Sequence, residues 1–273
     1  MANQDKGAGV RVSRIDIEQM ASAAATIREC RQELAARNAT LLGEITPAGT
    51  AIREWQRYPE GEVYDPESHT QFFFHMHPGS SRQAQEYGHF HTFLRAEGMP
   101  VGLAPLLLPE VAVADVVPPP SPQAAPLKRG TRDEVSHLIA IAIDVRGEPI
   151  RLFTTNRWVT GETWYRAEDV IRMLDRFVIA ETQPHALLNR WIGAIIQLFR
   201  PQIAGLLRAR DETVMGWRRR RRTQVFEDPR LEITSGLDIV LDAQLEFVER
   251  VRAGSNEGAC RAPVLPSMAE GWE

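Results

Sequence analysis

Residues 69–94 read HTQFFFHMHPGSSRQAQEYGHFHTFL, with two runs of aromatic residues and histidines separated by a polar segment. Side chains of a β-strand alternate between its faces, so each His-x-His pair in these runs projects two imidazoles to one face. The polar segment is short enough to return the chain as an antiparallel neighbour, where opposed side chains lie about 5 Å apart. The sequence therefore predicts four converging imidazoles, those of His75, His77, His89 and His91.

Four imidazoles on one face favour a metal site. Imidazole nitrogens bind Zn, Fe, Cu, Ni or Mn, whereas imidazoles crowded together without a metal repel when charged and leave nitrogens unpaired when dry. The candidate catalytic residues are Glu86, as ligand or proton acceptor, and Tyr87 and His137, which we expect to contact the ligands; His137 is alternatively a further ligand. A hydrogen-bonded or pH-sensing histidine cluster and a set of unrelated histidines are the alternatives.

A second group of candidates follows a predicted buried strand, in the polar and aromatic stretch 154–165. Loops on rigid scaffolds often carry binding groups, and an arginine can hold a carboxylate or phosphate with two hydrogen bonds. The substrate-binding candidates are Asn156, Arg157, Trp158 and Glu162. The equally favoured alternative is a structural turn in which Asn156 bonds its own backbone, Thr163 caps the next helix and the tryptophan rings fill the core.

Two resemblances follow from these motifs. The His-x-His pair followed by a glutamate is similar to the first metal motif of the cupin superfamily, but the second pair comes too soon for the second cupin motif. The stretches FFFHMH, EYGHFHTF and LFTTNRWVTGETWY together resemble a bacterial family of unknown function. That resemblance implies no activity, but it implies that the histidine block and the Asn-Arg-Trp block belong to one site.

The order of the predicted elements favours an α+β fold. Strands that cluster before helices, without regular βαβ alternation, are typical of a largely antiparallel sheet with helices on one face, and the last third of the chain is helical. We expect one domain over 1–253 and a loosely ordered tail over 254–273. The predicted elements are a helix over 14–44, strands within 55–94, a Pro-rich insertion at about 104–132, a hairpin over 137–154, and helices over 166–180, 184–209 with a kink at Pro201, and 237–251.

Composition places the chain among folded, soluble proteins. It has 32 Lys and Arg against 36 Asp and Glu, a net charge of −4, and 43% hydrophobic residues, which exclude a mainly disordered chain, a collagen-like repeat and a disulfide scaffold. No apolar run reaches the roughly 18 residues of a membrane span, so we expect a cytoplasmic protein. The run Arg218–Arg222 reads as a solvated helix end, and the acidic balance argues against a nucleic-acid partner.

The hypothesis that these observations favour is a metal-dependent enzyme with a mononuclear, histidine-rich site. Histidines with one carboxylate and no thiolate suit non-haem Fe(II), which leads us to expect oxygen-dependent oxidation of a small molecule. Zn or Cu would accept the same ligands, and a zinc hydrolase with Glu86 as general base is the first alternative. A non-catalytic protein that binds metal or a partner is the second, and a protein partner or a homodimer stays open.

Overall fold

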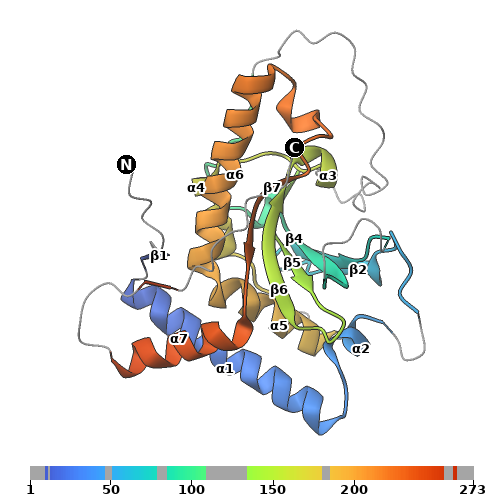
Figure 1. Ribbon diagram of the computed structural model, residues 1–273, viewed down its shortest axis with the longest axis vertical. Coiled ribbons are helices and arrows are strands. Elements are labelled where there is room, and N and C mark those ends of the chain that lie inside the picture. The colour runs from blue at the N-terminus through green and yellow to red at the C-terminus, as the bar shows by residue number, and fades with distance from the viewer. Residues whose placement is uncertain are drawn as a thin grey trace, which may run out of the picture.

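A six-stranded antiparallel sheet forms the centre of the computed structural model, which describes residues 10–11, 13–46, 51–78, 85–108, 134–179, 185–254 and 261–262. Each strand pairs with the next one along the chain, so the sheet is a meander (Figure 1). Its strands are β2 (Tyr58–Tyr64), β3 (Thr70–His75), β4 (Gly88–Arg95), β5 (Val135–Ile143), β6 (Pro149–Thr155) and β7 (Ile233–Asp238). Two short strands, β1 (Val10–Arg11) and β8 (Arg261–Ala262), pair with each other apart from this sheet.

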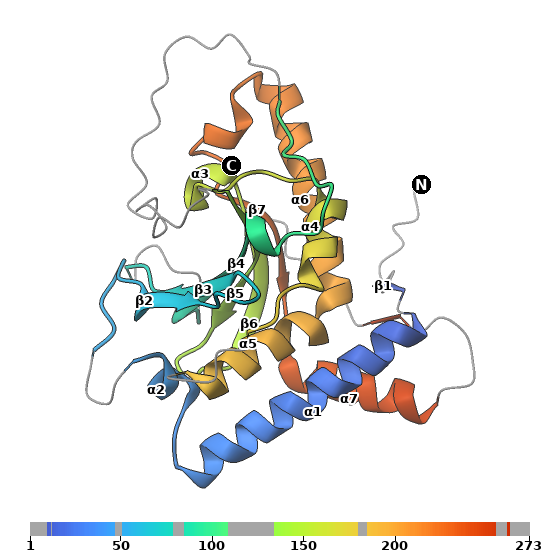
Figure 2. The same ribbon diagram turned by 180° about the vertical axis from the view of Figure 1, so that it is seen from behind.

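Most of the helices cover one face of the sheet, while the short helix α3 (Arg157–Thr160) lies at the end of β6 (Figures 1 and 2). The others are α1 (Arg14–Ala36), α2 (Leu41–Ile45), α4 (Ala167–Leu174), α5 (Ala186–Leu198), α6 (Arg200–Arg221) and α7 (Leu241–Ala253), with short 3-10 turns at Ala96–Gly98 and Val225–Glu227. α5 lies against the sheet, α1 packs on α5, and α7 packs on α1 (Figures 1 and 2). The predicted α+β class, with an antiparallel sheet and a helical C-terminal third, is therefore confirmed.

Strand alternation separates the two faces of the sheet. Phe72, Phe74 and Phe90 are fully buried in the core that the helices complete, and the ring of Phe90 lies 6.0 Å from that of Trp191 in α5. The intervening side chains of β3 and β4, including the histidines, project to the opposite face. β5 is buried along its whole length, as its continuous apolar sequence predicts.

Two of the predicted helices are interrupted. The helix expected over 14–44 ends at Ala36, because Asn38 adopts a left-handed conformation (φ 48°), and Thr40 then caps the separate α2. The helix expected over 184–209 is not one kinked helix but two, α5 and α6. Pro201 lies in the first turn of α6, since its ring has no N–H to continue the hydrogen bonding of α5.

The C-terminal region corrects two further boundaries. The helix expected over 166–180 is shorter and ends at Leu174. The helix expected over 237–251 begins only at Leu241, and the residues before it form β7, which the sequence pattern did not predict. β7 pairs with β6 at the edge of the sheet, and Ser235 Oγ donates to the carbonyl of Leu206 in α6. This strand is short and rich in small polar residues, so its position depends on distant partners.

Several expectations concern segments that are described only in part. Most of the Pro-rich insertion (109–133) and most of the tail (255–260 and 263–273) lie outside the described residues, so the single domain over 1–253 stays a prediction. The arginine run forms the last turn of α6, where Arg222 ends the helix with φ 49°. Within the described ranges, no helix is both long enough and apolar enough to cross a bilayer.

Candidate metal centre

The first two histidines of the centre face each other across β3 and β4. In the antiparallel register His75 lies opposite His89, and their Nε2 atoms are 2.7 Å apart. Gly88 allows this close pairing, because a Cβ atom at that position would lie 2.6 Å from the carbonyl oxygen of His75. The predicted antiparallel return of the chain is therefore confirmed.

His91 completes a group of three. One ring nitrogen each from His75, His89 and His91 lies within 4.8 Å of the others, and all three side chains are buried. Two nitrogens that bind one metal ion at right angles, each at about 2.1 Å from it, lie about 3.0 Å apart. Rotation and shift of the three rings would therefore bring all three nitrogens within bonding distance of one metal ion. The three residues can hold a divalent metal ion.

The protonation state of the imidazoles also fits a metal. Burial, reinforced by the neighbouring His89, holds the pKa of His75 and of His91 well below the usual value. The rings are therefore neutral at physiological pH, and neutral imidazole is the form that binds a metal. Neutral imidazoles that face one another leave some acceptor nitrogens without a hydrogen-bond donor, and a divalent metal ion would bind these nitrogens.

Two further groups contact the outward nitrogens of these ligands. Glu86 Oε1 lies 2.6 Å from His89 Nδ1, on the side of the ring away from the Nε2 that meets His75. Burial alone would raise the pKa of Glu86, but the hydrogen bond to His89 and the nearby imidazoles outweigh it and lower that pKa, so the group is a carboxylate. His137 Nε2 lies 3.0 Å from His91 Nδ1. Such contacts orient metal-binding histidines and fix which ring nitrogen carries the proton.

A β-bulge brings His137 to this face. Thr92 pairs with Ile139 and the next residue, Phe93, pairs with His137, so Leu138 is an extra residue in β5. Bulges of this kind redirect side chains. The sequence predicts that His137 lies near the site, because His137 begins the apolar strand of the hairpin. No pattern in the sequence indicates the bulge itself.

Comparison with known protein families gives one match. Residues 21–239 match a family described as Domain of unknown function (DUF6969). The chain belongs to this family. The matched region extends from α1 to the end of β7 and so includes the whole histidine group and the stretch 154–165. No curated protein and no solved structure matches the chain.

The fourth predicted ligand of this DUF6969 chain lies at the edge of the group. β3 ends at His75, so the strand alternation does not extend to His77. The His77 ring centre nevertheless lies 4.9 Å from that of His75 and 5.0 Å from that of His89, and it packs against Trp55 at 4.6 Å. His77 is therefore a neighbour of the three-histidine group, and its role as a ligand stays a prediction.

Aromatic rings surround the three histidines. The Phe73 ring lies 5.3 Å from His91, and the Phe153 ring lies 5.1 Å from His89. The guanidinium of Arg57 lies 4.3 Å above the Phe73 ring and donates to Glu62 Oε1 at 2.6 Å. Neither Arg57 nor Phe153 was among the sequence candidates. Arg57 precedes β2 and Phe153 lies in β6, so both lie outside the histidine motif in sequence.

Three of the four substrate-binding candidates make contacts with the segment before β7. Asn156 caps α3 and donates to the carbonyl of Val225 at 2.6 Å, and Trp158 Nε1 donates to the carbonyl of Leu231 at 2.8 Å. Arg157 forms an ion pair with Glu227. The contacts of Asn156 match the structural-turn alternative, but the expected cap at Thr163 is wrong, because α4 begins at Ala167 with Arg166 as its N-cap. A role in substrate binding stays a prediction for all three.

The remaining candidates are Glu162 and Tyr87. Glu162 is buried, and its Oε2 accepts a hydrogen bond of 2.9 Å from the backbone N–H of His137. Burial raises the pKa of Glu162 to about 7, against the opposing charge of Arg210. Through its bond to His137, Glu162 connects the stretch 154–165 with the histidine block.

The Tyr87 ring stacks on the Phe74 ring, with ring centres 6.4 Å apart, on the helix-covered side of the sheet.

Proposed function

We propose that this chain is a metal-dependent enzyme whose mononuclear centre is held by His75, His89 and His91, with Fe(II) as the metal and oxygen-dependent oxidation of a small molecule as the reaction. The observation that carries the proposal is a group of three buried histidines, two of them directly opposed on adjacent strands. Three protein ligands leave positions open for a substrate. When bound, Fe(II) would supply one-electron and oxygen chemistry there.

The surroundings of the centre favour oxidation over hydrolysis. A general base for hydrolysis must reach the water that attacks the substrate. Glu86, the carboxylate that such a base would require, is instead bonded to His89 Nδ1, on the outer side of that ring. Its role in the proposed enzyme is to orient His89 and to keep the proton on that nitrogen.

The other residues of the centre bind, orient and exclude water. Phe73 and Phe153 form apolar walls beside the histidines, which protects reactive chemistry from solvent. Arg57 lies over Phe73 near His75 and His91, and its ion pair with Glu62 offsets its positive charge. His137 holds the outward nitrogen of His91.

Metal analysis of protein purified without a His-tag tests the proposal. We expect about one equivalent of iron in protein prepared without oxygen, and an electron paramagnetic resonance signal after nitric oxide treatment. Stoichiometric zinc with no paramagnetic resonance signal would contradict the oxidation reaction and favour the zinc hydrolase. Less than about one-tenth equivalent of any transition metal, after attempted loading with Fe(II), Zn(II) and Cu(II), would contradict both.

Single substitutions test the ligand set. His75→Ala, His89→Ala and His91→Ala should each lower the bound metal to below about a tenth of the wild-type content, because each removes one of three ligands. His185→Ala is the matched control, since His185 precedes α5 on the helix-covered side and should keep full metal content. Full metal content in His75→Ala or in His89→Ala would contradict a shared site between β3 and β4.

A further inference from the structure

The buried carboxylate of Glu162 has a structural partner that the proposed reaction does not use. Its Oε2 accepts from the backbone N–H of His137, at the residue that flanks the bulge in β5. Bulges interrupt the regular hydrogen bonds of a sheet and leave backbone groups that need other partners. Glu162 therefore satisfies the backbone of the bulge from outside the sheet.

The bulge decides which side chain faces His91. Ala140 lies opposite His91, so strict alternation along β5 would put Leu138 on the histidine face and His137 on the helix-covered face. The extra residue reverses this order, and the His137 ring reaches His91. A hydroxyl on the other side closes the bulge, because Thr92 Oγ1 donates to the carbonyl of Ile139 at 2.7 Å.

The contact between His137 and His91 has a chemical consequence. His91 Nδ1 is engaged with His137 Nε2, so Nε2 is the nitrogen of His91 left for a metal. A neutral imidazole that binds through Nε2 carries its proton on Nδ1, and an acceptor at Nδ1 stabilises that tautomer. The position of His137 therefore affects the binding competence of His91.

We propose that Glu162 is a positioning residue of the metal centre, whose carboxylate holds the β5 bulge so that His137 keeps His91 in the tautomer that binds metal. The anchor itself is held in place. The backbone carbonyl of Glu162 accepts from Arg157 Nε at 3.1 Å, and its side chain is buried. This assigns a common purpose to the stretch 154–165 and the histidine block, and it rests on the proposed metal centre.

Metal affinity in three variants tests the inference, with Co(II) as the probe and a chelator as competitor. Glu162→Ala should weaken Co(II) binding about tenfold to hundredfold, the usual cost of losing an outer contact. Glu162→Gln should restore most of the affinity, because the amide oxygen can accept from the same N–H. Thr160→Ala is the control, since it removes only the 3.5 Å contact to the other carboxylate oxygen, and it should bind like the wild type.

A double-mutant cycle shows whether Glu162 acts through His137. In the His137→Ala background, Glu162→Ala should have little further effect on Co(II) affinity, because the pathway is already cut. An equal loss in both backgrounds, or wild-type affinity in Glu162→Ala, would overturn the inference. If Glu162→Ala fails to fold, Glu162→Leu takes its place in both backgrounds of the cycle, because leucine fills a similar volume but cannot accept the hydrogen bond from the His137 N–H.

Nitrogen NMR of the metal-free protein separates this inference from the proposed function. We expect the His91 imidazole to carry its proton on Nδ1 in the wild type and to mix tautomers in Glu162→Ala. If the wild type binds no metal but shows this dependence, the positioning role stands and the proposed function fails. If metal binds and the His91 tautomer ignores Glu162, only the positioning role fails.

Discussion

At the scale of single residues, we expect the Glu86 carboxylate to set how firmly the proposed centre binds a metal ion. Its carboxylate meets His89 Nδ1 at 2.6 Å, which orients the ring and raises the basicity of the nitrogen that faces the metal. We expect Glu86→Ala to weaken metal binding about tenfold to hundredfold and Glu86→Gln to weaken it less, because an amide oxygen accepts the hydrogen bond without the charge.

A chelator competition with Zn(II) or Co(II) measures this effect. Glu60→Ala is the matched control, because Glu60 lies in β2 with an exposed side chain and should leave the affinity unchanged. Equal affinity for the wild type and Glu86→Ala would show that the contact does not tune the ligand.

At the scale of elements, the pairing of β3 with β4 depends on one glycine. A Cβ atom on Gly88 would lie 2.6 Å from the carbonyl oxygen of His75 and would also collide with the Phe74 ring. Gly88→Ala should therefore lower the free energy of unfolding by about 1–3 kcal/mol and displace His75, with loss of bound metal. Gly193→Ala in α5 is the control, since a Cβ there meets no atom within 4 Å, and it should stabilise by up to about 1 kcal/mol. Urea denaturation and metal analysis check both variants, and a stable, metal-loaded Gly88→Ala would contradict the close approach.

The same elements show what the sequence could predict. Alternation in β3 and β4 predicted the opposed histidines because strand periodicity is local information. Three features could not be predicted from strand periodicity: the end of β3 before His77, the bulge in β5 at Leu138, and the strand β7. Each of them depends on pairing with partners distant in sequence. The contact between Glu162 and His137 joins residues 25 positions apart, and spacing alone gave no sign of it.

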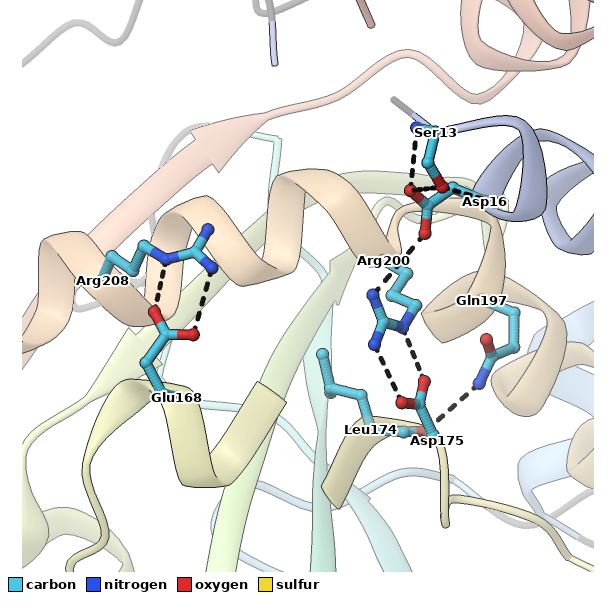
Figure 3. A network of polar contacts seen from close by, with 8 residues as sticks. All are labelled: Ser13, Asp16, Glu168, Leu174, Asp175, Gln197, Arg200 and Arg208. Atoms are coloured by element: carbon cyan, nitrogen blue, oxygen red, sulfur yellow. Dashed lines mark hydrogen bonds and ion pairs between the residues drawn. The ribbon is translucent and has the colours of Figure 1, made fainter. Parts of the chain in front are cut away.

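At the scale of the whole molecule, the main apolar core and the candidate metal centre lie on opposite faces of the sheet. The helices build the large apolar core on one face, and the histidines lie on the other. Arg200 in α6 contacts residues of two other helical segments (Figure 3). Its guanidinium donates two hydrogen bonds to the carboxylate of Asp175 after α4, at 2.6 and 2.9 Å, and its Nη1 atom lies 3.7 Å from Asp16 Oδ1 in the first turn of α1.

This separation gives a prediction with a built-in comparison. Arg200→Ala should lower the free energy of unfolding by about 1 kcal/mol, because the mostly buried Arg200 loses a two-pronged ion pair with Asp175. Arg208→Ala removes a similar pair with Glu168 that is exposed to solvent, and it should change stability by less than about 0.5 kcal/mol. Both variants should keep the metal content of the wild type, since the helical layer supplies no ligand. Urea denaturation and metal analysis measure the two quantities, and a loss of metal in a folded Arg200→Ala protein would show that the two faces are coupled.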